Sequence, residues 1–197
     1  MAQPYAAQSI IAGGGTKMAI RDAAVRLFGS KGFEQTSLRE VADAVGITKA
    51  SLYYHYPSKL DLLLAIIDPV VENIRRVVAE VDGLRHDADT VRRVLRDYLR
   101  GMVRHRDAGS MCVRDAVAIY NALSERYPDV LESGKVLTDW LAGPDAGYEA
   151  RVRAAAALSV ISSALTSDEY VPGVPDDVLE TTLLDAATSV LNIHATA

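Results

Sequence analysis

Apolar residues recur along most of the chain at spacings of three and four residues, which is the spacing of one face of an α-helix. The segment 16–30 has an apolar face that consists of Ile20, Ala23, Ala24, Leu27 and Phe28. Alternation of β-branched and polar residues, which is typical of a half-buried strand, is nearly absent. We therefore predict an all-α protein.

The same periodicity predicts eight further helices, separated by turn-forming clusters such as "GPDAG" and "SDEYVPGVP". Their predicted ranges are 37–45, 48–56, 58–81, 89–105, 108–123, 128–142, 147–166 and 176–193. Pro69 falls inside the fourth helix, where its ring removes one backbone hydrogen bond, so we expect a bend near Asp68. The chain thus divides into a three-helix domain at 16–60 and a larger helical domain at 61–197.

The second and third predicted helices carry clear end signals. Ser37 and Glu40 in "SLRE" have the spacing of a capping box, in which each side chain bonds the backbone amide of the other residue. Gly46 supplies a residue that takes positive φ at a helix end, and Thr48 is positioned to cap the next helix. Two helices joined by so short a turn form a helix-turn-helix.

The stretch "TKASLYYHY", residues 48–56, separates into two sides on a helical wheel. Leu52 and Tyr56 lie together and should pack on the preceding helix. The contacting side consists of Lys49, Ala50, Ser51, Tyr53, Tyr54 and His55. Hydroxyl, ammonium and imidazole groups suit phosphate oxygens and base edges, and a small Ala50 permits close approach to the floor of a major groove.

Three more residues fit a nucleic-acid surface. Thr36 and Thr48 stand at predicted helix starts, where unpaired amides and the positive end of the helix dipole favour phosphate, and Lys59 adds a cation nearby. A plainer interpretation stays open for each residue, since hydroxyl groups also serve only as caps and tyrosines also serve only as packing.

Charge is unevenly distributed along the 197 residues, whose net charge is −5. Residues 16–60 hold seven Lys and Arg against four Asp and Glu, whereas residues 61–197 hold 14 against 22. Because exposed charges act over about 10 Å, the local positive sign outweighs the acidic total in judging a DNA surface.

Composition limits the remaining possibilities. A hydrophobic fraction of 49% is sufficient for a buried core, and the single cysteine, Cys112, excludes an intrachain disulfide. Residues 1–15 lack the features of a secretory signal or membrane anchor, so we expect a mobile arm, a cytoplasmic protein and no membrane association. Without recognisable nucleophile, phosphate-binding or metal-ligand motifs, we expect no enzyme activity, no metal and no cofactor.

Residues 32–64, "GFEQTSLREVADAVGITKASLYYHYPSKLDLL", preceded by "AAVRLFGSKG", resemble the N-terminal DNA-binding domain of TetR-family transcriptional regulators. The resemblance covers about 50 residues, 16–66. It implies that the third helix reads a major groove, that Thr36 and Lys59 touch phosphates, and that the tyrosine run contacts backbone and bases. The implied DNA-binding residues are Thr36, Thr48, Lys49, Ala50, Ser51, Tyr53, Tyr54, His55 and Lys59.

The resemblance also implies a ligand-responsive regulator, commonly a repressor, that is released from DNA by a small-molecule effector. It implies a homodimer formed by the helices at 147–166 and 176–193, and two-fold symmetry then predicts a pseudo-palindromic operator with half-sites about 34 Å or more apart. Candidate pocket residues, each with an alternative role in the core, are Tyr98, Met102, Met111, Tyr120, Tyr127 and Trp140.

Two further alternatives remain at this point. A basic series, comprising Arg92, Arg93, Arg96, Arg100, Arg104 and Arg106, is either a solvated face or the site of an anionic effector or partner. A helix-turn-helix also occurs in proteins that never touch DNA, so a helical ligand-binding or adaptor protein is the alternative function. Salt-dependent DNA binding would distinguish a regulator from an adaptor.

Overall fold

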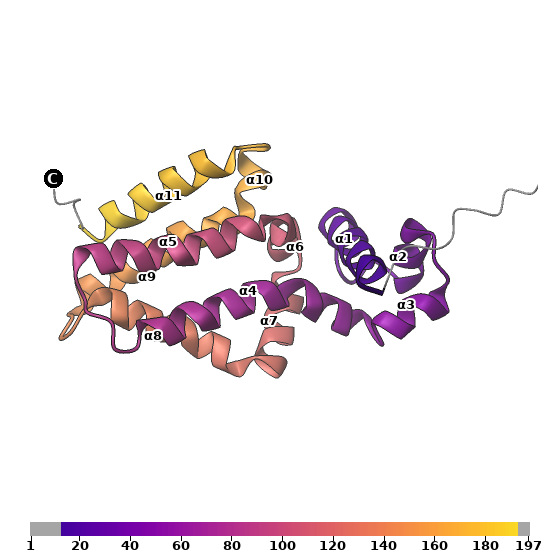
Figure 1. Cartoon of the computed structure of the whole chain (residues 1–197), viewed down its shortest axis with the longest axis horizontal. Helices are drawn as coiled ribbons and strands as arrows, with labels where there is room; N and C mark the ends of the chain where they lie inside the picture. The colour runs from indigo at the N-terminus through magenta and orange to yellow at the C-terminus, as the bar shows by residue number, and fades with distance from the viewer. Residues whose placement is uncertain (1–12, 193–197) are drawn as a thin grey trace, which may run out of the picture.

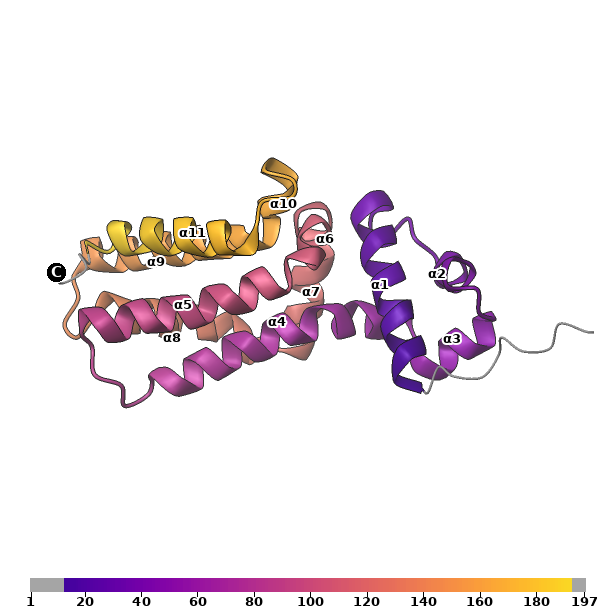
Figure 2. The ribbon, with the colours of Figure 1, turned by 45° about the horizontal axis from the view of Figure 1, so that its top comes forward.

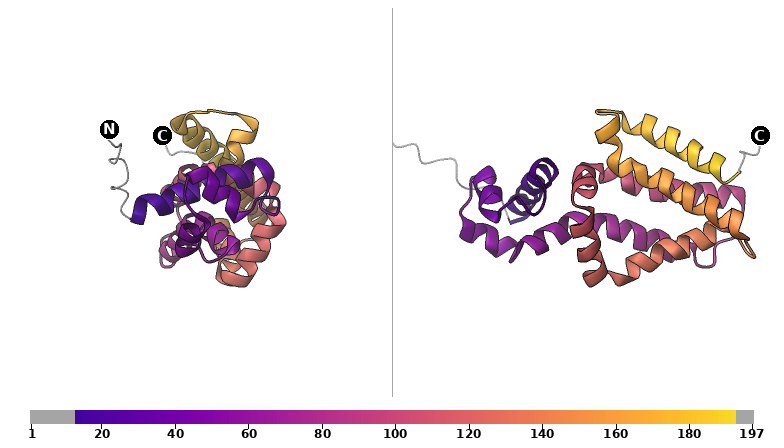
Figure 3. Two further views of the ribbon diagram at one scale, coloured as in Figure 1. Left: turned by 90° about the vertical axis from the view of Figure 1, so that its right-hand side faces the viewer. Right: turned by 180° about the vertical axis from the view of Figure 1, so that it is seen from behind.

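The computed structural model describes residues 13–192, which fold into α-helices and two short 3-10 turns, with no strand within this range. A small N-terminal domain lies at one end of an elongated molecule, and a larger helical domain lies at the other (Figure 1). The two are joined through one long helix, as the view from behind also shows (Figure 3). The predicted all-α fold with two helical domains is confirmed.

Four helices build the N-terminal end: α1 (Gly13–Lys31), α2 (Leu38–Val45), α3 (Lys49–His55) and α4 (Lys59–Val81). The capping box at the start of α2 is present, and Gly46 ends that helix with φ of 75°. The helix α1 begins three residues earlier than predicted, so the glycine run at 13–15 lies in its first turn. Residues 1–12 of the predicted arm lie outside the described residues.

The larger domain contains seven α-helices and the two 3-10 turns among the described residues. They are α5 (Ala88–Arg104), η1 (Arg106–Ala108), α6 (Gly109–Arg114), α7 (Ala116–Arg126), α8 (Pro128–Ala142), α9 (Tyr148–Ser162), η2 (Ser163–Thr166), α10 (Ser167–Tyr170) and α11 (Asp176–Val190). The helices α4, α5, α8, α9 and α11 run roughly lengthwise, whereas α6 and α7 lie at the end that faces α1 (Figure 2).

The helix predicted at 108–123 is in fact two helices, α6 and α7, which meet at Asp115. Asp115 leaves helical geometry with φ of −113° and ψ of 31°. Its carboxylate accepts a hydrogen bond from the Phe33 amide at 2.7 Å, and the neighbouring Arg114 donates to the Ser30 carbonyl. Contacts to the distant end of α1 thus accompany the interruption, and local periodicity does not reveal them.

The predicted helix at 147–166 also ends early, because its last turn is the 3-10 segment η2. The chain passes very close to α6 there. A Cβ added to Gly109 would lie 1.3 Å from the Leu165 carbonyl oxygen, so this approach requires glycine at position 109.

The two halves of α4, before and after Pro69, contribute to two separate hydrophobic clusters. Residues of α4 up to Ile67 are buried with α1, α2 and α3, whereas Val77 and Val81 are buried with the larger domain. The helix continues through Pro69 and changes direction along its length (Figures 1 and 2), and the location of the bend near Asp68 stays a prediction. The first cluster also takes residues of α6 and α7, including Met111 and Ile119, so it extends beyond the predicted boundary at residue 60.

No helix between residues 13 and 192 combines the length and apolar character needed to cross a membrane.

Candidate nucleic-acid interface

The inner side of α3 is fixed in the first hydrophobic cluster. Leu52 is fully buried beside Val41 and Ala42 of α2, and Tyr56 is 4% exposed just after the helix. The Tyr56 hydroxyl donates to the Lys17 carbonyl of α1 at 3.3 Å. Burial raises the pKa of the Tyr56 phenol, so it stays protonated as a donor. The predicted inward pair, Leu52 and Tyr56, is therefore confirmed.

The outer side of α3 presents its polar groups to solvent. Tyr54 is 86% exposed and Tyr53 is 41% exposed. The Lys49 ammonium lies 5.4 Å from the centroid of the Tyr53 ring, and the Tyr54 ring meets the His55 ring edge-on at 5.4 Å. Aromatic faces and a cation therefore lie beside one another on an accessible helix, the combination that stacks on and neutralises nucleic acid.

The start of α3 carries the remaining predicted residues. Thr48 caps the helix, its hydroxyl accepting from the Ser51 amide at 3.1 Å, and the residue remains exposed. Ala50 is exposed and Ser51 is half-buried, so both lie at the accessible first turn. The structure thus brings together seven of the nine predicted DNA-binding residues along one short helix.

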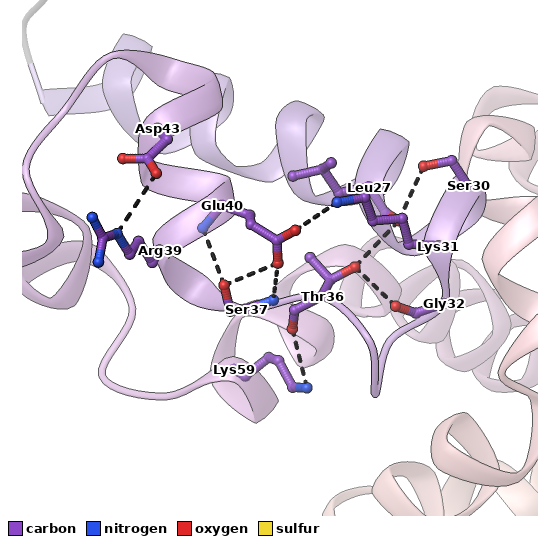
Figure 4. Close-up of polar contacts among 10 residues, drawn as sticks. All are labelled: Leu27, Ser30, Lys31, Gly32, Thr36, Ser37, Arg39, Glu40, Asp43 and Lys59. Carbon is purple, nitrogen blue, oxygen red and sulfur yellow. Dashed lines mark hydrogen bonds and ion pairs between the residues drawn. The ribbon is translucent and has the colours of Figure 1, made fainter.

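Thr36 lies elsewhere. Its side chain is turned inward in the α1–α2 turn, where the residue is 1% exposed. The hydroxyl donates to the Gly32 carbonyl at 2.9 Å and lies 3.3 Å from the Leu27 carbonyl (Figure 4). The prediction that this hydroxyl stands at a helix start is wrong, because Ser37 occupies the cap position of α2.

Lys59 is also directed into the protein. Its ammonium donates to the carbonyls of Phe33, Glu34 and Thr36 at 2.9, 3.3 and 3.2 Å, and the contact with Thr36 is drawn in Figure 4. The same nitrogen lies 4.4 Å from the centroid of the Phe33 ring. Because an ammonium has three N–H donors, these carbonyls use its donor capacity here, and the phosphate contact of Lys59 stays a prediction.

The start of α2 is held by a polar network on the surface. The Glu40 carboxylate accepts from the Ser37 amide at 2.8 Å and from the Lys31 ammonium at 2.5 Å (Figure 4). These hydrogen bonds, with the Lys31 bond the largest cause, lower the pKa of Glu40 to about 2. The capping carboxylate therefore stays ionised at neutral pH and stabilises the helix end beside α3.

Two exposed basic residues near the interface were missed by sequence reasoning. Lys17 of α1 reaches α3, with its ammonium 5.6 Å from the centroid of the Tyr56 ring. Arg39 of α2 has a side chain that is 80% exposed and lies 3.9 Å from Asp43. The sequence identifies both as basic, but only the fold places Lys17 beside a residue 39 positions away.

The six candidate ligand residues are distributed over both hydrophobic clusters and the surface. Tyr98 and Met102 belong to the second hydrophobic cluster, whereas Met111 is fully buried in the first. Tyr120 is 59% exposed on α7, and Tyr127 donates a hydrogen bond to Asp68 of α4. The remaining candidate, Trp140, lies near the end of α8. The role of these residues as ligand contacts stays a prediction.

Three arginines of the basic series contact the segment that leads into α11 or α11 itself. Arg92 and Arg100 pair with Asp185 and Glu180 of α11, at 2.8 and 3.4 Å. Arg106 lies 3.2 Å from Asp176 and donates to the Val174 carbonyl at 2.9 Å. These arginines thus connect α5 and the turn after it to the last helix of the domain.

The family model described as bacterial regulatory proteins of the TetR family matches residues 20–66. Among curated proteins, the regulator AcrR of Shigella flexneri is 38% identical over 65 residues, which are 33% of this chain and 30% of the relative. The repressor KstR2 of Rhodococcus jostii is 35% identical over 69 residues, which are 33% of this chain and 34% of that protein. The chain thus matches about a third of the length of these relatives.

Similarity to solved structures extends over nearly the whole chain. AmtR of Mycobacterium smegmatis superposes with a TM-score of 0.67 at 19% identity, covering 98% of this chain and 92% of that protein. A transcriptional regulator from Aquifex aeolicus gives a TM-score of 0.65 at 18% identity, covering 89% of this chain and 99% of that protein. At this identity the likeness establishes the fold. Residues 20–66 thus match the TetR-family model, and the described residues have the fold of these solved regulators.

Proposed function

We propose that the protein is a ligand-responsive transcriptional repressor that binds a pseudo-palindromic operator as a homodimer. The observation that carries this proposal is the exposed polar side of α3, held rigidly by Leu52 and Tyr56. An exposed helix that presents a cation, hydroxyl groups and aromatic rings matches what a major groove offers. Repression is supported by relatives whose names state it, KstR2 and the negative regulator IcaR of Staphylococcus aureus.

The proposed DNA-contacting set is now smaller than the one predicted from sequence. It consists of Thr48, Lys49, Ala50, Ser51, Tyr53, Tyr54 and His55, with Lys17 added from α1. Lys49 supplies the positive charge at the first turn of α3, and Tyr54 supplies the largest exposed ring. In this proposal Thr36 and Lys59 serve only to hold the turn that supports α2 and α4.

The proposed dimer uses α9 and α11. These helices pack against each other, and both expose small and apolar side chains to solvent. Exposed positions on these helices are Val152, Ala155, Ala156, Ser159, Val178, Thr182, Ala186 and Ser189. Small and apolar side chains permit close approach of helices, which favours a bundle with the same two helices of a second copy. Size-exclusion chromatography with light scattering tests this, because a monomer at micromolar concentration would contradict it.

Release from DNA would pass through the contacts between the two domains. The Asp115 carboxylate holds the Phe33 amide at the end of α1, and Arg21 of α1 lies 3.3 Å from Asp107. An effector that favours another arrangement of α6 and α7 would therefore also change the position of α1. The required coupling is modest, since about 1.4 kcal/mol changes operator affinity tenfold.

DNA binding is tested with a duplex from the region upstream of the protein's own coding sequence. We expect affinity to fall steeply with salt, because each phosphate contact releases condensed counterions. Lys49→Ala should weaken this binding, whereas Lys135→Ala, which removes an exposed lysine of α8, should leave it unchanged. Binding that is absent at low salt, or insensitive to Lys49→Ala, would favour the helical adaptor with a structural helix-turn-helix. Because the protein would act on DNA, we also propose that it is located in the cytoplasm.

A further inference from the structure

We propose that a hollow at the end of the larger domain farthest from α3 binds apolar organic cations. The hollow has a volume of 590 Å³ and lies between the end of α4, the turn that follows it and α8. It is lined by Val78, Ala79, Val81, Asp82, Gly83, Leu84, Val136 and Trp140. As an effector site it would rest on the proposed regulatory function, but binding itself does not depend on DNA.

The walls of the hollow are mostly apolar. Val78, Val81 and Leu84 approach from α4 and its turn, and Val136 and Trp140 approach from α8. Val136 is 48% exposed, so a bound ligand would remove apolar surface from water. A volume of this size is within the range of small-molecule sites. These features select an occupant with a sizeable apolar body.

Three features select a positive charge on that occupant. Asp82 is the one charged residue among the eight lining residues, all of which the structure describes. The helix α4 ends at Val81, so the negative end of its dipole points toward the same turn. The Trp140 ring offers a negative face, and tryptophan binds cations better than other aromatic residues.

Two basic residues on either side of the lining segment in α4 and its turn already have carboxylate neighbours. Arg76 of α4 lies 2.9 Å from Glu80 and also donates to the Asn73 side chain at 2.9 Å. Arg85, in the turn beyond Leu84, lies 3.8 Å from Asp87. These pairs reduce the positive charge that a bound cation would meet near Asp82.

The Trp140 ring is supported from behind by His86. The two rings meet at 70° with centroids 5.5 Å apart, and His86 Nε2 lies 3.2 Å from the Leu141 carbonyl. Gly143 has φ of 93°, and a Cβ at that position would lie 3.0 Å from His86 Cε1. Glycine thus allows the histidine to remain against the tryptophan, which holds the ring ready for a ligand.

The test uses the protein's single tryptophan as its reporter, because Trp140 itself lines the hollow. The probe is the 3-hydroxyphenyltrimethylammonium cation, and its control is 3-tert-butylphenol, which has nearly the same shape and chromophore without the charge. We expect saturable quenching of Trp140 fluorescence by the cation, at a dissociation constant about tenfold or more below that of the neutral compound. Equal affinity of the two compounds, or no saturable signal from the cation, would overturn the proposal.

Matched variants locate the charge effect. Asp82→Asn should weaken binding of the cation about tenfold and leave the neutral compound unaffected. Asp177→Asn removes the same charge from the exposed first turn of α11, outside the hollow, and should change cation binding less than about twofold. Equal losses in both variants would mean that general surface charge, and not this hollow, attracts the cation.

Operator binding forms a separate measurement. Saturating cation should change operator affinity at least about fivefold, because α4 extends from the hollow to the DNA-binding domain. If the cation binds but operator affinity stays constant, the effector role is overturned and the binding site stands. If no DNA binds at all, the proposed regulatory function fails, while the fluorescence result still decides the site.

Discussion

The N-terminal domain contains two pairs of threonine and lysine residues with the same chemistry and opposite surroundings. Thr48 and Lys49 begin α3 and are exposed to solvent. Thr36 is 1% exposed, and the Lys59 ammonium is bound to three backbone carbonyls. The same residue types thus lie on an exposed surface at one place and form an internal support at the other.

The difference arises from the backbone around each pair. At α3, the N-terminal amides need an acceptor, which the Thr48 hydroxyl provides while remaining at the surface. Between α1 and α2, the turn that follows Gly32, with φ of 97°, leaves carbonyl groups that need donors. Lys59 and Thr36 supply those donors. A buried carbonyl without a donor would lower the stability of this turn, so these internal hydrogen bonds stabilise it.

The largest effect is expected at Lys59. Lys59→Ala removes the donor to three carbonyls and should lower the free energy of unfolding by about 2 kcal/mol. Lys49→Ala removes the same charge from the surface and should change it by less than about 0.5 kcal/mol. Urea denaturation of both variants measures the difference. Equal stabilities would show that Lys59 does not hold the turn.

A variant on the exposed side of α3 should lower DNA affinity and leave the stability of the fold nearly unchanged. Tyr54→Ala should weaken binding by about 1.4 kcal/mol, or tenfold, because the ring is 86% exposed and lies on the contacting side of α3. Its stability should stay near that of the unchanged protein. Fluorescence anisotropy with a labelled duplex gives the affinity, and the exposed Tyr170 of α10 provides the control Tyr170→Ala. A similar loss of DNA affinity in the control variant would contradict the proposal that α3 contacts DNA.

Asp115 supports the same turn from the larger domain. Asp115→Ala leaves the Phe33 amide without its acceptor and should cost about 1 kcal/mol of stability. Asp107→Ala, which removes only an exposed pairing with Arg21, should cost less than about 0.5 kcal/mol. Thermal unfolding of the two variants checks this. If both cost the same, the amide contact adds nothing beyond surface charge.

The smallest effect concerns the pH dependence at Glu40. Its pKa in the folded protein is about 2, against 4.5 for an ordinary glutamate. Glu40 therefore contributes stability above pH 4.5, and this contribution is lost as the pH falls toward 2. Carboxyl NMR titration should show the low pKa, and Lys31→Met should raise it. A titration of Glu40 near 4.5 in the unchanged protein would contradict the network.

The sequence predicted the all-α fold, the capping box at Ser37, and the division of α3 into Leu52 and Tyr56 inside and a polar side outside. These features depend on local periodicity and end signals. It did not predict the break at Asp115 or the inward turn of Thr36 and Lys59, because each depends on a contact with another element. The pairing of α5 arginines with α11 was missed for the same reason.

The most direct measurement is lysine acetylation followed by mass spectrometry, with and without saturating operator duplex. Lys49 should react in the free protein and become protected by DNA, whereas Lys59 should react slowly in both states because its ammonium is bound to carbonyls. Lys135 of the larger domain should react equally in both states and serves as the internal control. Unchanged reactivity of Lys49, or a reactive Lys59 that DNA protects, would contradict the assignment of α3 and its first-turn lysine as the DNA-contacting element.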